Sequence, residues 1–517
     1  MVALLAVVVA IHVCLAVERS ANLLEHDEAI SLLVAAGKSD RIQGLYADLD
    51  RLTIRPAGEL QDLLRPAHNT STGDVIRSLS HNDIHPPLYF LILHGLATLA
   101  PDQHAAYRLF GTLLFLIAAW LAMRWIWPRA APVARLLGLA WLLATPVMIG
   151  IATELRQYAL VCLGVAVSLA ALIALWEERK PARHTVMLLA LAPVVLLWTQ
   201  YGTVVWIAAA FLVALAHLLS GKWRRWPILA VAMLLSAVLI SPVLIWGQET
   251  IHTHASPASG MAFGSAASAI ARGLTEAWCS LPWAWRNSPA PPIMAVLMFV
   301  LTAVLAWRHG GAVDRALWCA AVGWCALWII LLAAGRIPPH AVEAKHLAPL
   351  VLVSVSLVVR AASGGRRPWV RRTAITVLVV SLASHVLGIW QLFARPTDAH
   401  LVAALRSADC LVIDTPKRGY ALPLIAEMKP DAAVAVGGAD VTLECWEALE
   451  SRLPEDRLVL AEIDSCHEGK RNPLSQKVFD RLAARYLEVV SLREGPRRTI
   501  TSFRHRRAVN TERRQSE

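Results

Sequence analysis

Residues 85–127 read HPPLYFLILHGLATLAPDQHAAYRLFGTLLFLIAAWLAMRWIW, which is two apolar runs separated by a short polar turn. The second run, 107–127, has the ~20 residues that an α-helix needs to cross the hydrocarbon core of a bilayer. The first run, 86–100, is shorter and begins with two prolines, which are tolerated in the first turn of a helix. This stretch therefore predicts one membrane-spanning helix preceded by a short apolar helix.

The composition extends this pattern to most of the chain. Of 517 residues, 56% are hydrophobic and only 17% are charged, and the mean hydropathy is +0.51. A typical soluble chain is ~25% charged, so this composition excludes soluble, disordered, fibrous and disulfide-scaffold proteins. It predicts a polytopic α-helical membrane protein of about eleven transmembrane helices plus one juxtamembrane helix. Besides 107–127, the predicted spans are 1–17, 133–152, 158–176, 184–198, 201–219, 227–246, 291–307, 316–335, 347–360 and 372–393.

The positive charge identifies the cytoplasmic side. The net charge is +11, and sixteen Lys and Arg residues gather in five loops, at 124–135, 179–183, 222–225, 308–315 and 360–372. Cytoplasmic loops of membrane proteins carry such an excess, so the basic charge indicates topology and predicts no nucleic-acid partner. With these loops inside, 18–84 and the C-terminal tail lie outside. A single crossing then fits between residue 85 and the first cluster, so 86–100 lies along the outer interface.

Residues 394–517 have a different character. Strand-like runs at 410–414, 432–437, 457–463 and 486–492 alternate with helix-like stretches, and basic and acidic residues are almost equal in number. Such alternation favours a small α/β domain with a partly parallel sheet. We therefore predict a transmembrane domain over 1–393, with a first outer loop at 18–106. A C-terminal extracytoplasmic α/β soluble domain with a basic tail follows over 394–517.

Two acidic or histidine-rich clusters fall on the predicted outer side. Asp27 and Glu28 are adjacent carboxylates just beyond the first span, suited to activate a hydroxyl or to hold a divalent cation. The alternative is a solvated loop start. His81, Asp83 and His85 form the second cluster, which is either a metal site or an ordinary polar loop.

Basic residues on the same side run against the charge bias. Arg156 and Tyr158 lie between two predicted spans, and Arg336, Lys345 and His346 lie in a loop before a later span. Together they predict a basic pocket at the outer interface, where the natural ligand is a lipid phosphate. The alternatives are an ion pair between Glu154 and Arg156, or an arginine whose side chain reaches out of the membrane to the interface. Carboxylates plus an anion pocket suit group transfer from a lipid-phosphate donor, because a phosphate leaving group needs cationic stabilisation more than a proton.

The sequence also resembles a family. The order of an apolar first helix, the Asp27-Glu28 pair, HPPLYFLILHGLATLA (85–100) and ELRQYAL (154–160) is similar to the C-type (GT-C) membrane glycosyltransferases. Within them it resembles bacterial members of family 39, which are related to the protein O-mannosyltransferases and the lipid A aminoarabinose transferases. The resemblance covers roughly residues 1–360. It implies a polyprenyl-phosphate sugar donor and a juxtamembrane helix at 86–100.

The resemblance also implies roles for individual residues. Asp27 matches the acidic motif that carries the catalytic carboxylate, with Glu28 as its supporting neighbour. His85, next to Asp83, falls where some relatives place a metal-binding or phosphate-orienting residue. Arg156 and Tyr158 match the donor phosphate-binding motif. Lys345 and His346 stand at a segment that usually reads Arg-Tyr, so the charge is kept while bidentate recognition by arginine is not.

These features together predict an integral membrane glycosyltransferase. We expect it to move a sugar from a polyprenyl-phosphate donor to a lipid, glycan or protein acceptor by an inverting single displacement. A divalent cation such as Mg or Mn is the candidate cofactor. We expect a multi-pass protein of a bacterial inner membrane, surrounded by membrane lipids, with its active site on the periplasmic face. The alternative is a flippase, transporter or ligase of lipid-linked sugars, for which a basic pocket would also serve.

Overall fold

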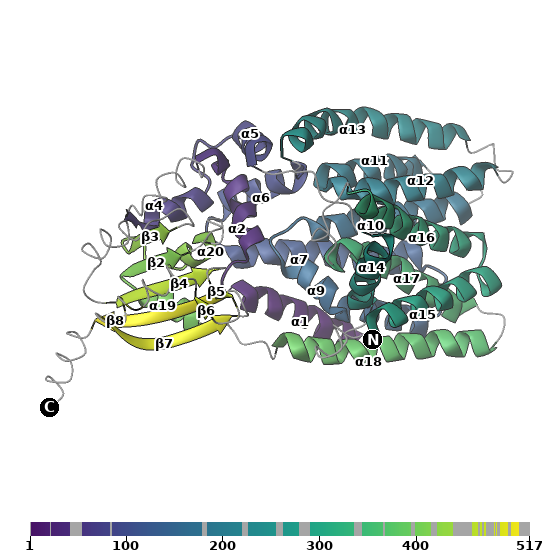
Figure 1. Cartoon of the computed structure of the whole chain (residues 1–517). Coiled ribbons are helices and arrows are strands. Elements are labelled where there is room, and N and C mark those ends of the chain that lie inside the picture. The colour runs from purple at the N-terminus through teal and green to yellow at the C-terminus, as the bar shows by residue number, and fades with distance from the viewer. Residues whose placement is uncertain are drawn as a thin grey trace. The chain divides into compact units, whose positions relative to one another are not determined.

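The structure is a computed structural model of the whole chain (Figure 1). It describes residues 2–20, 22–41, 54–82, 85–177, 183–219, 226–254, 262–278, 290–335, 344–364, 368–393, 399–414, 421–437, 457–463, 466–467, 470–471, 480, 482, 486–494 and 498–505. The chain divides into two compact units. Unit 1 comprises Met1–Val17, Ile84–Tyr89 and Ala105–Arg395, and unit 2 comprises Glu18–Asp83, Phe90–His104 and Pro396–Glu517. Most of the predicted outer loop thus groups with the C-terminal residues.

Unit 1 is built from helices. Its elements are α1 (Val2–Ser20), α7 (His104–Leu121) with a π-helical turn η2 (Ala122–Ile126), α8 (Pro132–Ala144), α9 (Pro146–Thr153), α10 (Tyr158–Glu177), α11 (Arg183–Thr199), η3 (Tyr201–Thr203), α12 (Val204–Leu219), α13 (Trp226–His254), α14 (Phe263–Trp278), α15 (Ala290–Val304) with a second π-helical turn η6 (Leu305–His309), α16 (Ala312–Ala333), α17 (Ala344–Gly364) and α18 (Pro368–Phe393).

A helix lies at each of the eleven predicted spans. Five described helices are long and apolar enough to cross a membrane by themselves, or six if the bent pair α8 and α9 is one span. The count of eleven crossings stays a prediction. The bend of 60° falls where Thr145 is followed by Pro146, since the residue before a proline is driven away from helical geometry. The short helix α6 (Leu88–Leu99) has 12 residues, too few to cross a bilayer of ordinary thickness. Its position along the outer interface stays a prediction.

Helix α17 lies at the centre of unit 1. Every residue from Leu350 to Val359 is buried, and the helix packs against α8, α14, α16 and α18. Helix α14 lies in a stretch that the sequence predicts as a loop. Its buried side chains include Ile270, Leu274 and Trp278, and the ring of Trp278 meets that of Phe299 in α15 edge to face at 5.4 Å.

Unit 2 contains a mixed sheet and several short helices. The helices are α2 (His26–Ala35), α4 (Ala57–Gln61), η1 (Asp62–Leu64), α5 (Thr72–Asn82), most of α6, α19 (Ala399–Ser407) and α20 (Leu422–Ile425). The strands are β1 (Arg55–Pro56), β2 (Cys410–Asp414), β3 (Ala433–Gly437), β4 (Arg457–Ile463), β7 (Tyr486–Glu494) and β8 (Arg498–His505), in the order β1-β3-β2-β4-β8-β7, and β5 (Cys466–His467) pairs with β6 (Lys470–Arg471). Strand β2 is parallel to β3 and β4, and the other pairs are antiparallel.

The outer loop contributes directly to this sheet. Strand β1 supplies its edge, with Arg55 opposite Val434 and Pro56 opposite Ala433. The buried amide of Gln61 then donates to the carbonyl oxygens of Ile425 and Met428, at 3.0 and 2.7 Å. Strands β2, β3, β4 and β7 coincide with the predicted runs, whereas β8 lies in a stretch for which the sequence predicts no strand.

Candidate functional site

The Glu154–Tyr158 loop is held in place by helix α7. Arg108 is only 2% exposed, and its Nη1 donates to the carbonyl oxygen of Thr153 at 2.7 Å. Thr112 donates from Oγ1 to the carbonyl oxygen of Ala152 at 3.2 Å. Gly111, between them, lets the helices approach closely, since a Cβ there would stand 2.9 Å from the same Ala152 oxygen. The last turn of α9 is therefore fixed to α7 immediately before the loop begins.

Tyr158 is the centre of a cluster that joins two distant parts of the chain. Its hydroxyl shares a hydrogen bond with Nε2 of His346, 188 residues away in sequence, at 3.2 Å. The two rings meet edge to face with centroids 5.3 Å apart. The centroid of the Tyr158 ring also lies 5.8 Å from the guanidinium carbon of Arg156 and 5.1 Å from Nζ of Lys345. Both distances are within the ~6 Å range of cation–π attraction.

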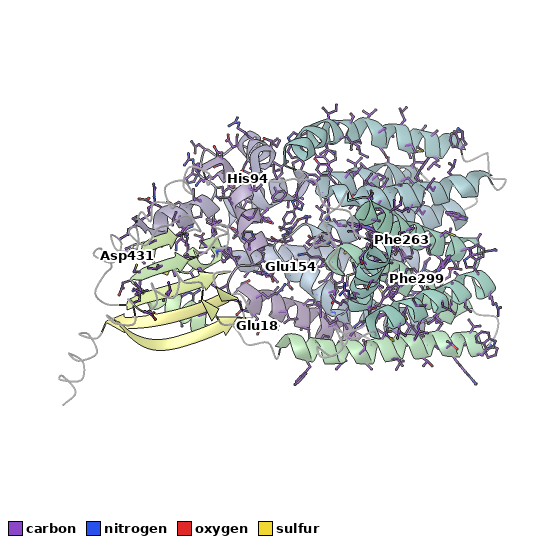
Figure 2. The ribbon with its side chains drawn as sticks, in the orientation of Figure 1. Glu18, His94, Glu154, Phe263, Phe299 and Asp431 are labelled. Carbon is purple, nitrogen blue, oxygen red and sulfur yellow. The ribbon has the colours of Figure 1, made fainter. Side chains whose placement is uncertain are left out.

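This group, which we call the Tyr158 cluster, comprises Arg156, Tyr158, Lys345 and His346. Arg156 and Tyr158 are buried, at 8% and 3% exposure, and Lys345 and His346 are half-buried. A fifth residue, the aromatic Trp328 of α16, lies beside His346 with ring centroids 6.2 Å apart. Two cations in so apolar a setting are energetically expensive, and in membrane proteins such groups mark substrate or ion sites. The partly buried carboxylate of Glu154, labelled in Figure 2, offsets part of their charge.

Gln157 was not among the predicted site residues. Its side chain is fully buried, and neither Oε1 nor Nε2 has a hydrogen-bond partner among the residues that the structure describes. Burying an amide without partners costs free energy, so its position directly between Arg156 and Tyr158 indicates that it hydrogen-bonds to a bound polar ligand.

Arg108 is a second residue that the sequence analysis did not select. Its signal was available in the sequence, because it is an arginine at the start of an apolar membrane run.

The acidic pair lies in unit 2, at the start of α2. Glu28 is 1% exposed, and its Oε2 accepts the backbone N–H of Glu25 at 2.9 Å, so this carboxylate caps the helix. Asp27 is half-buried in the same first turn, where the helix dipole favours a negative charge. Of the two carboxylates, Asp27 is thus the better placed to act on a ligand.

The metal prediction has no geometric support so far. Asp83 and Arg336 lie outside the described residues, and His85 is half-buried at the start of the segment leading into α6. Among the residues that the structure describes, no group of three or more His, Cys, Asp and Glu side chains could hold a metal ion. A divalent cation therefore stays a prediction.

Known proteins resemble this chain in structure. No protein-family model matches it, and no match is found among curated protein sequences. Two crystal structures of ArnT from Cupriavidus metallidurans match over 97% of both chains. The apo form has 14% identity and a TM-score of 0.51, and the form bound to undecaprenyl phosphate has 12% identity and a TM-score of 0.50. The mycobacterial arabinofuranosyltransferase AftD matches at 17% identity and a TM-score of 0.45, over 96% of this chain and 39% of its own.

ArnT is a lipid A aminoarabinose transferase and a member of the C-type enzymes. The structural similarity extends over nearly the whole length of both proteins. The chain therefore has the fold of the C-type membrane glycosyltransferases, the family that its sequence resembles.

Proposed function

We propose that this protein is a membrane glycosyltransferase that takes its sugar from a polyprenyl-phosphate donor. The observation that carries the proposal is the Tyr158 cluster, in which two cations flank one tyrosine within an apolar helix bundle. A buried guanidinium and a half-buried ammonium group match a phosphate in charge and in hydrogen-bond donors. A neighbour in fold, ArnT, has been crystallised with undecaprenyl phosphate, which is a ligand of this class.

In the proposed reaction the acceptor's hydroxyl or amine attacks the anomeric carbon of the sugar. The bond between that carbon and the phosphate oxygen breaks, and the configuration inverts. Asp27 accepts the proton of the acceptor as a general base, with Glu28 supporting the helix turn that carries it. Arg156, Tyr158, Lys345 and His346 hold the phosphate and stabilise the charge that develops on it as it departs, and Arg336 adds to this positive field. His85, close to Asp83 in the sequence, is the candidate residue for orienting the phosphate or binding a metal ion.

The proposal also covers location and domain roles. We place the protein in a bacterial inner membrane with the reaction on the periplasmic face, because the positive loops are predicted on the other side. The segment 1–393 carries the catalytic residues, and 394–517 helps to bind the acceptor. The acceptor itself is a lipid, a glycan or a protein.

The test compares two carboxylate variants that lie two residues apart. Transfer is measured from a panel of radiolabelled polyprenyl-phosphate sugars into membrane extracts by wild type, Asp27→Asn and Glu25→Gln. Glu25 is the matched control, because it is an exposed carboxylate of the same helix start that pairs with Arg19. We expect Asp27→Asn to lose about 10²–10⁴-fold in rate, the usual contribution of a general base, and Glu25→Gln to stay near wild type.

A third variant tests the donor site. Lys345→Gln should weaken donor binding about tenfold, since one charge-assisted contact to the phosphate is lost. Equal transfer by wild type and Asp27→Asn would remove Asp27 from the reaction. If the donor lipid crosses the bilayer of sealed vesicles and no sugar is transferred, the protein is a flippase and the transferase proposal is wrong.

A further inference from the structure

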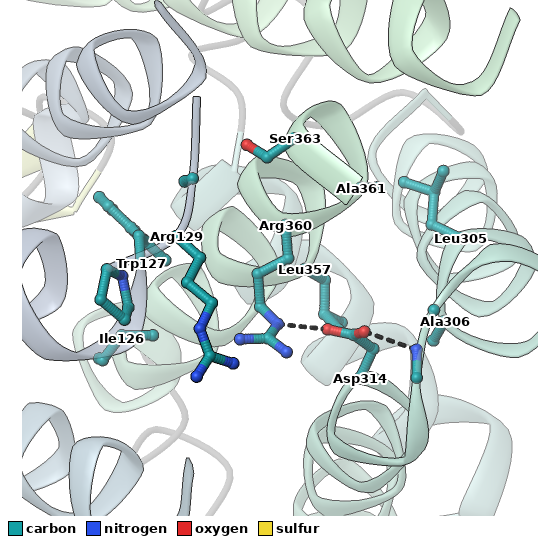
Figure 3. Close-up of a pocket in the computed structure, with 14 residues that line it drawn as sticks. Ile126, Trp127, Arg129, Leu305, Ala306, Asp314, Leu357, Arg360, Ala361 and Ser363 are labelled. Atoms are coloured by element: carbon teal, nitrogen blue, oxygen red, sulfur yellow. Dashed lines mark hydrogen bonds and ion pairs between the residues drawn. The ribbon is translucent and has the colours of Figure 1, made fainter. Parts of the chain in front are cut away.

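A second polar site lies at the other end of helix α17. The Tyr158 cluster takes Lys345 and His346 from the first turn of this helix, whereas Arg360 and Ser363 lie in its last turns. Fifteen residues of helix separate Lys345 from Arg360, which is roughly 22 Å along the axis. Near Arg360 is a cavity of about 300 Å³, lined by the ends of several helices of unit 1 (Figure 3).

Three ionisable side chains line this cavity, and together they are positive. They are Arg129, Asp314 and Arg360. Asp314 accepts Nε of Arg360 on one carboxylate oxygen at 2.5 Å and the backbone N–H of Gly311 on the other at 2.8 Å. Arg129 points into the same pocket from the loop before α8 (Figure 3). Two guanidinium groups and one carboxylate thus line the cavity, so the described lining carries a net positive charge, which suits an anion. Arginine binds phosphate bidentately.

The walls of the cavity come from two unusual helix ends. Helix α7 ends in the π-helical turn η2 and α15 ends in the π-helical turn η6, and Ile126, Leu305 and Ala306 of these turns line the cavity. Single π-turns are rare and frequently occur at functional sites. The turns provide an apolar wall directly beside the arginines, as the junction between a phosphate and an acyl chain requires.

Tryptophan residues locate this site at the level of lipid head groups. Trp125 of η2 and Trp307 of η6 are 38% and 53% exposed, on the same two turns that line the cavity. Exposed tryptophan is typical of the membrane–water interface, where an amphipathic ring fits best. Arg315 lies over the Trp307 ring, with its guanidinium carbon 6.0 Å from the centroid. These neighbours favour a ligand that arrives from the lipid layer over a phosphate from solution.

We propose that this cavity binds the phosphate head group of an anionic phospholipid. Arg129 and Arg360 hold the phosphate, Asp314 orients Arg360, and the π-turns accept the start of the acyl chains. Because the cavity lies among the basic loops, the lipid belongs to the leaflet that the charge pattern predicts to be cytoplasmic, where basic pockets between helices bind anionic head groups. The site is independent of the Tyr158 cluster and of the proposed transfer reaction.

The test uses the purified full-length protein in detergent and compares variants of two exposed arginines at and just after the turn η2. Thermal unfolding and native mass spectrometry are recorded with phosphatidylglycerol, phosphatidylcholine or inorganic phosphate added to wild type, Arg129→Gln and Arg124→Gln. Arg124 is the matched control because it is exposed in η2 yet does not line the cavity. We expect phosphatidylglycerol to bind wild type and Arg124→Gln alike, and Arg129→Gln about tenfold more weakly. Phosphatidylcholine should bind weakly to all three.

A further variant closes the cavity without changing charge. Ala361→Phe places a ring in the pocket and should abolish the preference for phosphatidylglycerol while Arg124→Gln keeps it. Equal loss in Arg129→Gln and Arg124→Gln would overturn the proposal, since it would mean diffuse attraction to a basic surface. Stabilisation by inorganic phosphate equal to that by phosphatidylglycerol would also overturn it, in favour of a soluble phosphate ligand.

Discussion

Gln157 shows how a single residue can be unfavourable for the fold and useful for a ligand. Its amide is fully buried in the loop that carries Arg156 and Tyr158, and its two polar atoms have no partner within the described part of the chain. Such an amide destabilises the empty protein, because it has lost its water without gaining a protein partner. A phosphate oxygen would accept a hydrogen bond from Nε2, and a sugar hydroxyl would donate one to Oε1.

The change Gln157→Leu separates these two effects. We expect the melting temperature to stay unchanged or to rise, because an apolar side chain of similar shape no longer buries an unsatisfied amide. Donor binding should weaken about tenfold, as one or two hydrogen bonds to the ligand are lost. Gln103→Leu, at an exposed position, is the control for both measurements. A lowered melting temperature with normal transfer would show that the amide is structural.

Cys410 is a free thiol that is made unreactive by its burial. It begins β2 and is fully buried, and this burial raises the pKa of the thiol to about 12. In the unfolded chain a thiol ionises near ~8.5, so the unfolded state binds fewer protons between these two values and stability falls as the pH rises through that window. At pH 9 we expect iodoacetamide to modify Cys410 in denaturant and not in the native protein, as read by peptide mass mapping. Equal rates in both states would contradict the burial.

At the level of elements, the close contact between α7 and α9 positions the Tyr158 cluster. Gly111 faces the carbonyl oxygen of Ala152, which is backbone and cannot turn aside as a side chain could. Gly111→Ala should therefore push the helices apart and lower the free energy of unfolding by about 1–3 kcal/mol, with a parallel loss of transfer. Gly150→Ala is the matched control, because a Cβ at that position of α9 meets nothing within 4 Å. It should be neutral or stabilising, by up to about 1 kcal/mol. Chemical denaturation of the two variants distinguishes these outcomes.

The elements that sequence predicts well are those whose signal is local. Apolar runs identify the positions of the long helices. The bend between α8 and α9 was not predicted, because the apolar run 133–152 predicts one continuous span. Helix α14 was not predicted, because its apolar residues are spaced among small and polar residues and form no continuous apolar run. Strand β8 was not predicted because its sequence, RTITSFRH, has only two apolar residues, Ile500 and Phe503, and they do not alternate as strand residues usually do. The strand depends on its pairing with β4 and β7.

The residues of the candidate site also divide into those with a local sequence signal and those without one. Motifs predicted Arg156, Tyr158, Lys345 and His346 one by one, and the structure brings these four together. Gln157 and the second cavity could not be predicted, because each depends on which side chains surround a position after folding. Strand β1 is a similar case, since nothing in two residues of an outer loop predicts that they complete a sheet formed by residues more than 350 positions away.

At the scale of the whole molecule, the proposed reaction depends on which loops face which side of the membrane. The basic loops and the exposed apolar residues of helices such as α13, among them Leu234, Val238 and Ile245, agree with a bilayer around unit 1. We predict that single cysteines placed at Thr72 and Arg124, both exposed, have opposite accessibility. In intact spheroplasts a membrane-impermeant maleimide should label Thr72→Cys strongly and Arg124→Cys only after lysis, with the wild-type chain as background for its own thiols. The reverse pattern would place Asp27 on the cytoplasmic side, and a periplasmic transfer reaction would then be excluded whatever the chemistry of the Tyr158 cluster.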